Sequence, residues 1–213
     1  MNLKDKRILI TAGPTWVPID NVRVISNVAT GETGVLLAHD LIKKGANVTL
    51  VLGPVVNNRI SRKIRVIPFR FFDELNRIIR KEITAVKYDA VIHTAAVSDY
   101  EPAVLCDKKI KSGIKGLRIV LKPTPKIIDC IKKMQPDVLL VGFKFEPNEG
   151  IKVLFNEARR LIKRSKLDLA VANTVRSHKY KAYILNKNKA LGPFLDKNRL
   201  VRSLVKEIDS LMY

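Results

Sequence analysis

The segment from residue 11 to residue 34 gathers polar side chains that could bind and activate a small substrate. It follows an apolar run that ends at Thr11. About twenty residues separate this run from the start of a predicted helix that contains two glycines. Such a strand–loop–helix order opens many nucleotide-binding α/β domains, although the loop is far longer than a compact dinucleotide-binding turn. A polar loop of this length is more typical of an active-site wall than of a linker. Its polar residues include Thr11, Asp20, Arg23, Ser26, Asn27 and Thr30.

Two features at the end of this segment suggest acyl and phosphate chemistry. In Thr30-Gly31-Glu32-Thr33-Gly34 the backbone N–H groups of a helix start could bind an anion, and the glycines allow a ligand to approach the backbone. Equally, Thr30 could simply cap the helix. Asn27 is neutral and polar, which suits holding an acyl oxygen while an amine attacks it, but asparagine is also a common turn residue.

A second polar group follows an apolar run over residues 90–94. Asp99 would lie at the carboxyl end of that strand, where α/β sheets place ligands, unless it caps a turn. Lys109 lies in a lysine-rich stretch over 107–111. An ammonium group on a mobile flap can neutralise charge that develops at phosphorus, whereas a lysine cluster in a loop is usually solvated surface.

Positioning these residues requires a sheet with helices on both faces. Apolar strand-like runs alternate with helical periodicity, which predicts a Rossmann-like three-layer α/β/α sandwich with a mostly parallel sheet. The predicted strands are Arg7–Thr11, Asn47–Leu52, Ile64–Pro68, Ala90–Thr94, Val138–Phe143 and Leu169–Ala172, and the predicted helices span 32–44, 71–85, 125–133, 150–165 and 197–211.

Two segments interrupt the alternation. Residues 99–123 are polar and lysine-rich and are expected to form a flap, with a return strand at Leu117–Leu121. Lys181–Leu195 is expected to form an antiparallel edge hairpin turning around Asn186–Lys189. We expect a single domain over residues 1–213, because no composition shift or repeat divides the chain.

Composition excludes several classes of protein. The chain has 213 residues and only two cysteines, Cys106 and Cys130, so neither a disulfide framework nor a cysteine zinc site is expected. The three histidines form no metal-binding motif, and His93 is expected to be a core residue. No signal peptide or membrane-spanning run is evident, so we expect a cytoplasmic protein. The net charge of +20 suggests a solvated basic surface or phosphate attraction rather than nucleic-acid recognition.

Ordered motifs resemble a known family. The sequences TAGPT, PIDNVR and ISNVATGETG near the N-terminus, followed by AAVSDYEP at 95–102, KIKS at 109–112, VGFKFE at 141–146 and DLAVAN at 168–173, are similar to those of phosphopantothenate–cysteine ligases. The resemblance runs from about residue 7 into the C-terminal helix. Each block is only moderately specific, but their order and spacing together are strongly so.

The resemblance implies roles for individual residues. Asn27 and Lys109 would be catalytic, and Ser26, Asn27, Thr30 and Gly31 would form the phosphopantothenate and acyl pocket. The nucleotide would be bound by Gly13, Asp99, Lys109, Thr124, Pro125, Lys126, Ile127 and Phe143. For Phe143, which would lie against the base, a core phenylalanine is the alternative.

The chain departs from the family pattern at two places. Thr124-Pro125-Lys126-Ile127 stands where the family has Asn-Pro-Asp-Ile. Leu161 and Ser165 stand where bacterial members carry two lysines, four residues apart, that reach the triphosphate. Arg160, Lys163, Arg164 and Lys166 are nearby cations that could substitute for the missing pair.

The resemblance implies a reaction and its partners. The carboxylate of 4′-phosphopantothenate would attack the α-phosphate of CTP, favoured over ATP, and the acyl-cytidylate would then react with L-cysteine in a step of coenzyme A biosynthesis. Mg²⁺ would accompany the triphosphate without a protein-built metal site. A homodimer is expected, with flap residues completing the neighbouring site, and the flavin-dependent decarboxylase would be elsewhere or absent. The alternatives are a nicotinamide-dependent reductase, although no G-x-G-x-x-G motif occurs, and a non-enzymatic nucleotide- or nucleic-acid-binding module.

Overall fold

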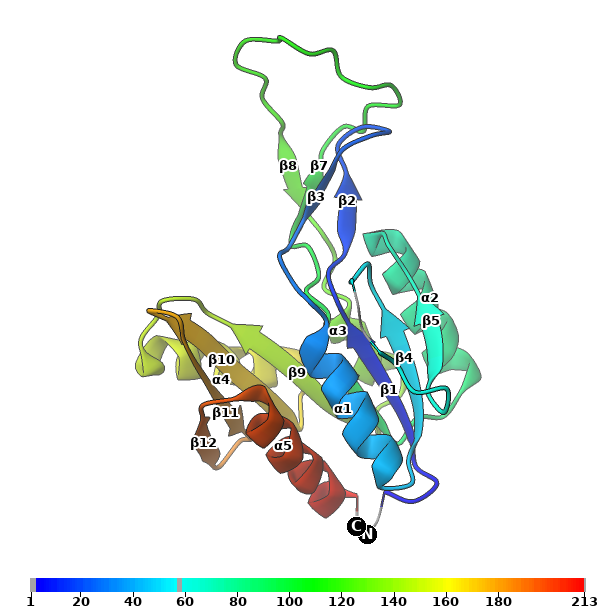
Figure 1. The fold of residues 1–213 in the computed structure, drawn as a ribbon, viewed down its shortest axis with the longest axis vertical. Coiled ribbons are helices and arrows are strands. Elements are labelled where there is room, and N and C mark those ends of the chain that lie inside the picture. Colours follow the sequence, from blue (N-terminus) through cyan, green and yellow to red (C-terminus); the bar gives the residue numbers. More distant parts are fainter. Residues whose placement is uncertain (1–2, 57–58, 213) are drawn as a thin grey trace.

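The computed structural model describes residues 3–56 and 59–212. Within them, one eight-stranded sheet runs through the molecule in the order β12-β11-β10-β9-β6-β1-β4-β5 (Figure 1). The strands from β5 to β10 in this order are parallel, and β11 and β12 are antiparallel to their neighbours. The bounds are β1 Arg7–Ala12, β4 Asn47–Leu52, β5 Arg65–Pro68, β6 Ala90–His93, β9 Leu139–Phe145, β10 Leu169–Arg176, β11 Lys179–Leu185 and β12 Ala190–Phe194.

Helices cover both faces of this sheet. Helices α1 (Glu32–Lys43) and α5 (Lys197–Leu211) pack against one face, and α2 (Phe72–Ala85), α3 (Ile128–Met134) and α4 (Ile151–Ser165) pack against the other. The central strands are apolar on both sides because each face is buried by helices. The predicted three-layer α/β/α fold with a mostly parallel sheet is confirmed.

The strand order reverses between β1 and β6. The chain builds β4 and β5 on one side of β1 and then returns to place β6 on the other side. A crevice outside the carboxyl ends of β1 and β6 is therefore where a ligand is expected in this fold. Gly34 lets α1 approach closely, since a Cβ there would lie 2.4 Å from the Cβ of Ala12. The close approach at Gly34 is thus to β1 and not to a ligand.

Two short hairpins form an arm that projects from the sheet (Figure 1). One joins β2 (Trp16–Pro18) to β3 (Val24–Ser26), and the other joins β7 (Tyr100–Pro102) to β8 (Leu121–Pro123). The sequence predicted the flap but not β2, β3 and β7. The return strand predicted at Leu117–Leu121 begins only at Leu121, the first residue of β8 that pairs with β7.

The C-terminal hairpin is longer than predicted. Strand β10 continues to Arg176 and pairs with β11, which in turn pairs with β12. The predicted turn is present: Asn186 N–H donates to the Lys189 carbonyl at 3.0 Å, and the Asn186 side chain accepts from the N–H of Lys189 at 2.8 Å. The edge strand β12 contains Pro193, which cannot donate a ladder hydrogen bond.

Candidate active site

A cavity of about 810 Å³ opens at the carboxyl ends of β6 and β9, between these strands and helix α4. It brings together six residues that the sequence assigned to a site: Asn27, Asp99, Thr124, Lys126, Ile127 and Phe143. Its wall also includes His93, Ala95–Ser98, Lys144, Glu157, Arg160, Leu161 and Arg164. Pro125 lies in the chain between two lining residues.

An ion pair lies on the cavity wall. Lys126 Nζ lies 2.5 Å from Asp99 Oδ1, and both side chains are partly exposed. Thr124 fixes this corner, because its hydroxyl donates to the Ser98 carbonyl at 2.6 Å and its N–H donates to the Asp99 carbonyl at 2.9 Å. The lysine that replaces the family's aspartate therefore pairs with the neighbouring carboxylate.

Asn27 is held by its own amide group. Its Nδ2 donates to the carbonyls of Ala96 at 3.1 Å and Val97 at 3.2 Å. Because both amide hydrogens are used, its Oδ1 is the atom left to act on a ligand, as an acceptor. The role assigned to Asn27 from the sequence, holding an acyl oxygen while an amine attacks it, stays a prediction. Ser26 braces the turn, with its hydroxyl 3.3 Å from the Thr15 carbonyl.

Gly13, Thr30 and Gly31 lie beside the cavity lining rather than within it. Gly13 accepts from the N–H of Ala96 through its carbonyl at 2.9 Å. Gly31, with φ of 70°, occupies the N-cap position of α1, so the predicted capping position of Thr30 was off by one residue. The Thr30 hydroxyl still accepts from the N–H of Glu32, at 3.4 Å. The positive φ favours glycine at position 31, and a Cβ there would also lie close to Val55 Cγ1, at 3.1 Å, and to the Gly13 nitrogen, at 3.3 Å.

Helix α4 supplies a cationic wall that the sequence only partly indicated. Arg160 and Arg164, one helical turn apart, both line the cavity, and Leu161 lies between them. Ser165 is buried and donates to Asp129 Oδ1 at 2.5 Å, facing α3. Of the four cations named from the sequence, Arg160 and Arg164 are on the cavity wall. Their spacing of four residues was the signal that could have selected them.

His93 lines the cavity as a neutral imidazole. Its Nδ1 lies 2.9 Å from the Thr11 hydroxyl, and the Ala95 N–H donates to the same hydroxyl at 3.3 Å. The Thr11 hydroxyl therefore links the imidazole ring to the backbone at Ala95. Burial lowers the pKa of His93 to about 4. The predicted core histidine is thus confirmed, at a position that also borders the cavity.

This burial predicts a specific loss of stability in acid. Between pH 6.5 and pH 4 the unfolded chain protonates His93 but the folded chain does not, so stability falls as the pH falls. We expect about 2 kcal/mol of the stability lost between pH 7 and pH 5 to come from this group. Denaturant unfolding of the wild type and His93→Gln at both pH values measures it. Equal pH dependence of the two proteins would contradict the prediction.

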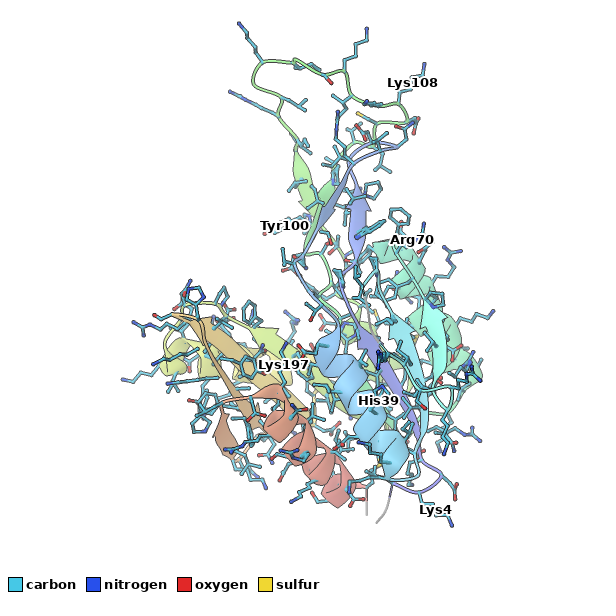
Figure 2. The ribbon with its side chains drawn as sticks, in the orientation of Figure 1. Lys4, His39, Arg70, Tyr100, Lys108 and Lys197 are labelled. Carbon is cyan, nitrogen blue, oxygen red and sulfur yellow. The ribbon has the colours of Figure 1, made fainter. Side chains whose placement is uncertain are left out.

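Lys109 lies on the arm and not in the cavity of its own chain. Its neighbour Lys108 points outward near the far end of the arm (Figure 2), and residues 103–109 are exposed. The arm also exposes apolar side chains, among them Val104 at 78 %, Leu105 at 59 % and Val120 at 72 %. The structure therefore separates the predicted catalytic residues, with Asn27 at the cavity and Lys109 at the end of the arm.

Among the described residues, no helix is long and apolar enough to cross a membrane. The same residues contain no cluster of three or more histidine, cysteine or acidic side chains that could hold a metal ion.

Comparisons with known proteins agree with the motifs. Residues 3–211 match the family model described as the DNA/pantothenate metabolism flavoprotein C-terminal domain. The coenzyme A biosynthesis bifunctional protein CoaBC of Thermococcus kodakarensis is 38% identical over 216 residues, which cover 99% of this chain and 53% of that protein. The chain spans about half the length of the curated relatives it matches.

Solved structures show the same fold. The DNA/pantothenate metabolism flavoprotein from Streptococcus pneumoniae superposes with a TM-score of 0.86 at 25% identity, covering 97% of this chain and 99% of that one. The C-terminal domain of a coenzyme A biosynthesis bifunctional protein CoaBC superposes with a TM-score of 0.82 at 26% identity, covering 100% and 98%.

Proposed function

Because this chain belongs to the DNA/pantothenate metabolism flavoprotein C-terminal domain family, we propose that it ligates 4′-phosphopantothenate to L-cysteine in coenzyme A biosynthesis. The carboxylate attacks the α-phosphate of CTP, a P–O bond forms and pyrophosphate leaves. The cysteine amine then attacks the acyl carbon, and CMP leaves as the amide forms. The observation that carries this proposal is the cavity that joins Asn27 to Asp99, Phe143 and the cations of α4.

The cavity suits a nucleoside triphosphate. Phe143 offers an aromatic surface to a base, and Asp99 offers a carboxylate that can accept from a ribose hydroxyl. Arg160 and Arg164 bring positive charge to one wall for the phosphates. Asn27 Oδ1 would accept from the cysteine amine and orient its lone pair toward the acyl carbon.

The donor set fits a magnesium ion that arrives with the triphosphate. The two carboxylates on the cavity wall are each paired with a cation, Asp99 with Lys126 and Glu157 with Arg160. They offer no cage of free oxygen ligands, so phosphate oxygens and water would complete the coordination. When bound, the ion would neutralise part of the charge on the phosphates.

The two arginines of α4 are expected to replace the family's lysine pair. Arg160→Gln and Arg164→Gln should each raise KM for CTP about tenfold, because a charge-assisted contact to phosphate is lost. Lys163→Gln, on the same helix but outside the cavity lining, is the matched control. Initial rates of pyrophosphate release against CTP concentration measure the effect. An equal effect of all three substitutions would contradict direct contacts and would mean that α4 acts only through its total positive charge.

The active unit is expected to be a homodimer in which the arm reaches the neighbouring cavity. The exposed apolar residues of the arm need cover, and a groove of about 530 Å³ beside β2 offers Trp16 and Phe71 with Asp73 and Glu101 as an apolar and acidic surface. Light scattering should give twice the chain mass of 24.1 kDa. Val104→Asp with Leu105→Asp should give an inactive monomer. A wild-type monomer with full ligase activity would contradict the shared site.

One assay tests the proposal as a whole. Purified chain is incubated with 4′-phosphopantothenate and CTP or ATP, with and without cysteine, and CMP or AMP, pyrophosphate and the amide are measured. Pyrophosphate without cysteine and amide only with it are the expected results. Thermal-shift measurements with CTP, NADPH and an oligonucleotide separate the ligase from a reductase and from a nucleic-acid-binding module. Stabilisation by NADPH or oligonucleotide alone would overturn the proposal.

A further inference from the structure

A buried carboxylate lies at the turn of the β2–β3 hairpin, away from the cavity. The Asp20 side chain is fully buried, and its Oδ1 accepts from the N–H groups of Val22 at 2.9 Å and Arg23 at 2.7 Å. Its Oδ2 accepts from Arg23 Nη1 at 2.9 Å and from the backbone N–H of Ile110 at 3.0 Å. Three of these four contacts shape the local turn, but the fourth reaches the flap, ninety residues further along the chain.

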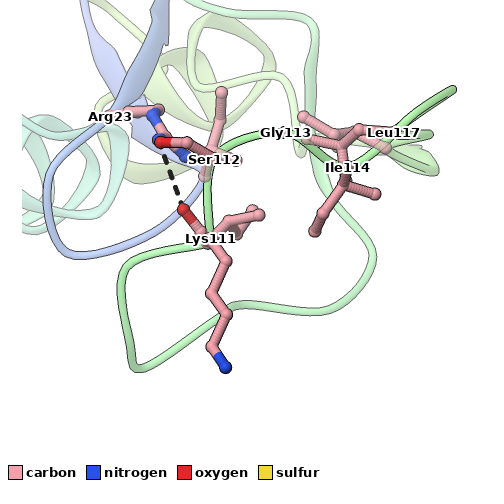
Figure 3. Close-up of a pocket in the computed structure, with 9 residues that line it drawn as sticks. Arg23, Lys111, Ser112, Gly113, Ile114 and Leu117 are labelled. Atoms are coloured by element: carbon pink, nitrogen blue, oxygen red, sulfur yellow. Dashed lines mark hydrogen bonds between the residues drawn. The ribbon is translucent and has the colours of Figure 1, made fainter.

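Arg23 completes a two-point hold on the same flap residue. While its Nη1 donates to Asp20, its Nη2 donates to the carbonyl of Ile110 at 3.3 Å (Figure 3). The N–H and the C=O of one residue are therefore bound by one ion pair. We call Asp20 and Arg23 the clamp.

Ile110 is the point at which the flap loop is anchored. Among residues 103–123, all of which the structure describes, Ile110 is the only one that is partly buried; the others are exposed. It lines a cavity of about 310 Å³ together with Ile19 and Arg23 of the β2–β3 hairpin. A longer contact, 3.5 Å from the Cys106 N–H to the Ile19 carbonyl, joins the same two segments. Lys109 immediately precedes this anchor.

We propose that Asp20 and Arg23 are positioning residues that hold the flap backbone at Ile110 and thereby fix Lys109 for its action on the triphosphate. This inference rests on the proposed function, because it gives Lys109 a role in pyrophosphate release. Adjacent Cα atoms are about 3.8 Å apart, so holding Ile110 restricts the start of the Lys109 side chain. The clamp also joins the β2–β3 hairpin to the flap loop between β7 and β8.

The charge state of the clamp supports this assignment. The N–H of Ile110 is the main cause that lowers the pKa of Asp20, and the N–H groups of Val22 and Arg23 and the Arg23 charge act in the same direction. Asp20 is therefore ionised at neutral pH, and its bond to the flap is charge-assisted. An asparagine at position 20 would carry no charge, and its NH2 group could not accept from the N–H groups that Asp20 binds.

The first test measures pyrophosphate release in the absence of cysteine, which reports the step assigned to Lys109. Asp20→Asn should lower kcat for this step about ten- to a hundredfold, since a small misplacement of a catalytic group has effects of this size. KM for CTP should change much less. Arg23→Lys should lower this kcat less than Arg23→Gln does, because lysine keeps the positive charge beside Asp20. It should still be slower than wild type, because lysine lacks the second nitrogen that reaches Ile110. Asp107→Asn, an exposed position on the same loop, is the matched control.

A double substitution separates positioning from general damage. If Asp20 acts through Lys109, Asp20→Asn should slow Lys109→Gln little further, whereas independent effects would multiply. Full multiplication, or an Asp20→Asn protein as fast as wild type, would overturn the clamp. If Lys109→Gln is itself as fast as wild type, the role of Lys109 in the proposed function fails, and the clamp is then judged by proteolysis alone.

Limited trypsin digestion measures the hold of the clamp on the flap independently of catalytic activity. Asp20 binds the N–H of the Lys109–Ile110 peptide bond, and Arg23 binds the carbonyl of the next one. The Lys115–Gly116 bond on the same loop is exposed and serves as the internal reference. Asp20→Asn should raise cleavage after Lys109 about tenfold relative to cleavage after Lys115. An unchanged ratio would overturn the hold on the flap. Unaltered near-UV circular dichroism and thermal midpoint establish that the variants are folded.

Discussion

Replacing Lys109 with glutamine is expected to slow pyrophosphate release about 100- to 1000-fold. As the carboxylate attacks the α-phosphate, negative charge moves onto the departing pyrophosphate, and an ammonium group brought over it in a water-poor site lowers the barrier. Glutamine retains a hydrogen-bond donor but not the charge. The measurement is a single-turnover assay of pyrophosphate with saturating CTP, so that weaker binding does not mask the chemical step.

The position of Lys109 provides both a control and a second experiment. Lys108→Gln removes the adjacent charge, and its side chain points outward near the far end of the arm, so it should be nearly silent. Because Lys109 is remote from the cavity of its own chain, a Lys109→Gln chain mixed with an Arg160→Gln/Arg164→Gln chain should recover activity. Random pairing would restore about a quarter of the wild-type sites. If the mixture is no more active than the sum of the two variants alone, Lys109 does not act at the cavity of the partner chain, and the shared site is contradicted.

The sheet was predictable because its strands are buried on both faces. Leu169–Ala172 is entirely apolar and Asn47–Leu52 mostly so, and the alternation of such runs with amphipathic helices allows few arrangements. The predicted ends were less accurate, since β10 continues four residues further to Arg176. There its pairing with β11, and not hydrophobicity, holds the backbone extended.

The β2–β3 hairpin of the arm was not predictable from local pattern. Strand β2 has three residues, and β3 is Val24–Ser26 within a polar stretch, so neither shows the alternation of a longer strand. What organises them is Asp20, which binds Arg23 in the same turn and Ile110 in a distant segment. A carboxylate that joins segments so far apart in sequence cannot be recognised from its neighbours alone.

The site, like the fold, was predictable in part. Asp99 and Asn27 were found because each lies within a motif that resembles the family's, and the structure places both on the cavity wall. Arg160 and Arg164 were named from the sequence together with Lys163 and Lys166, and only their spacing of four residues, the same as that of the family's lysine pair, distinguishes them. The orientation of α4 against α3, fixed in part by Ser165 and Asp129, determines which of them face the cavity.

Asn27→Asp is expected to separate the two half-reactions. Pyrophosphate release should continue, because the triphosphate is bound by groups other than Asn27, but formation of the amide should fall about 100-fold. An aspartate cannot donate to the carbonyls of Ala96 and Val97, and its charge would be repelled by both oxygens, so the acceptor that faces the amine would be displaced. A carboxylate would also favour a protonated amine, which is no nucleophile.

The consequence is that the acyl-nucleotidylate should accumulate. Stopped reactions of Asn27→Asp with CTP, 4′-phosphopantothenate and cysteine should contain pyrophosphate in excess of CMP, the difference being the intermediate, which mass spectrometry can identify. Asn198→Asp, an exposed position at the start of α5, makes the same chemical change far from the cavity and should leave both steps intact. If Asn27→Asp releases pyrophosphate and forms amide at equal, wild-type rates, Asn27 has no part in orienting the amine. If both steps fail together, its bonds to Ala96 and Val97 support the nucleotide cavity as a whole, and the acceptor role must be assigned to another group.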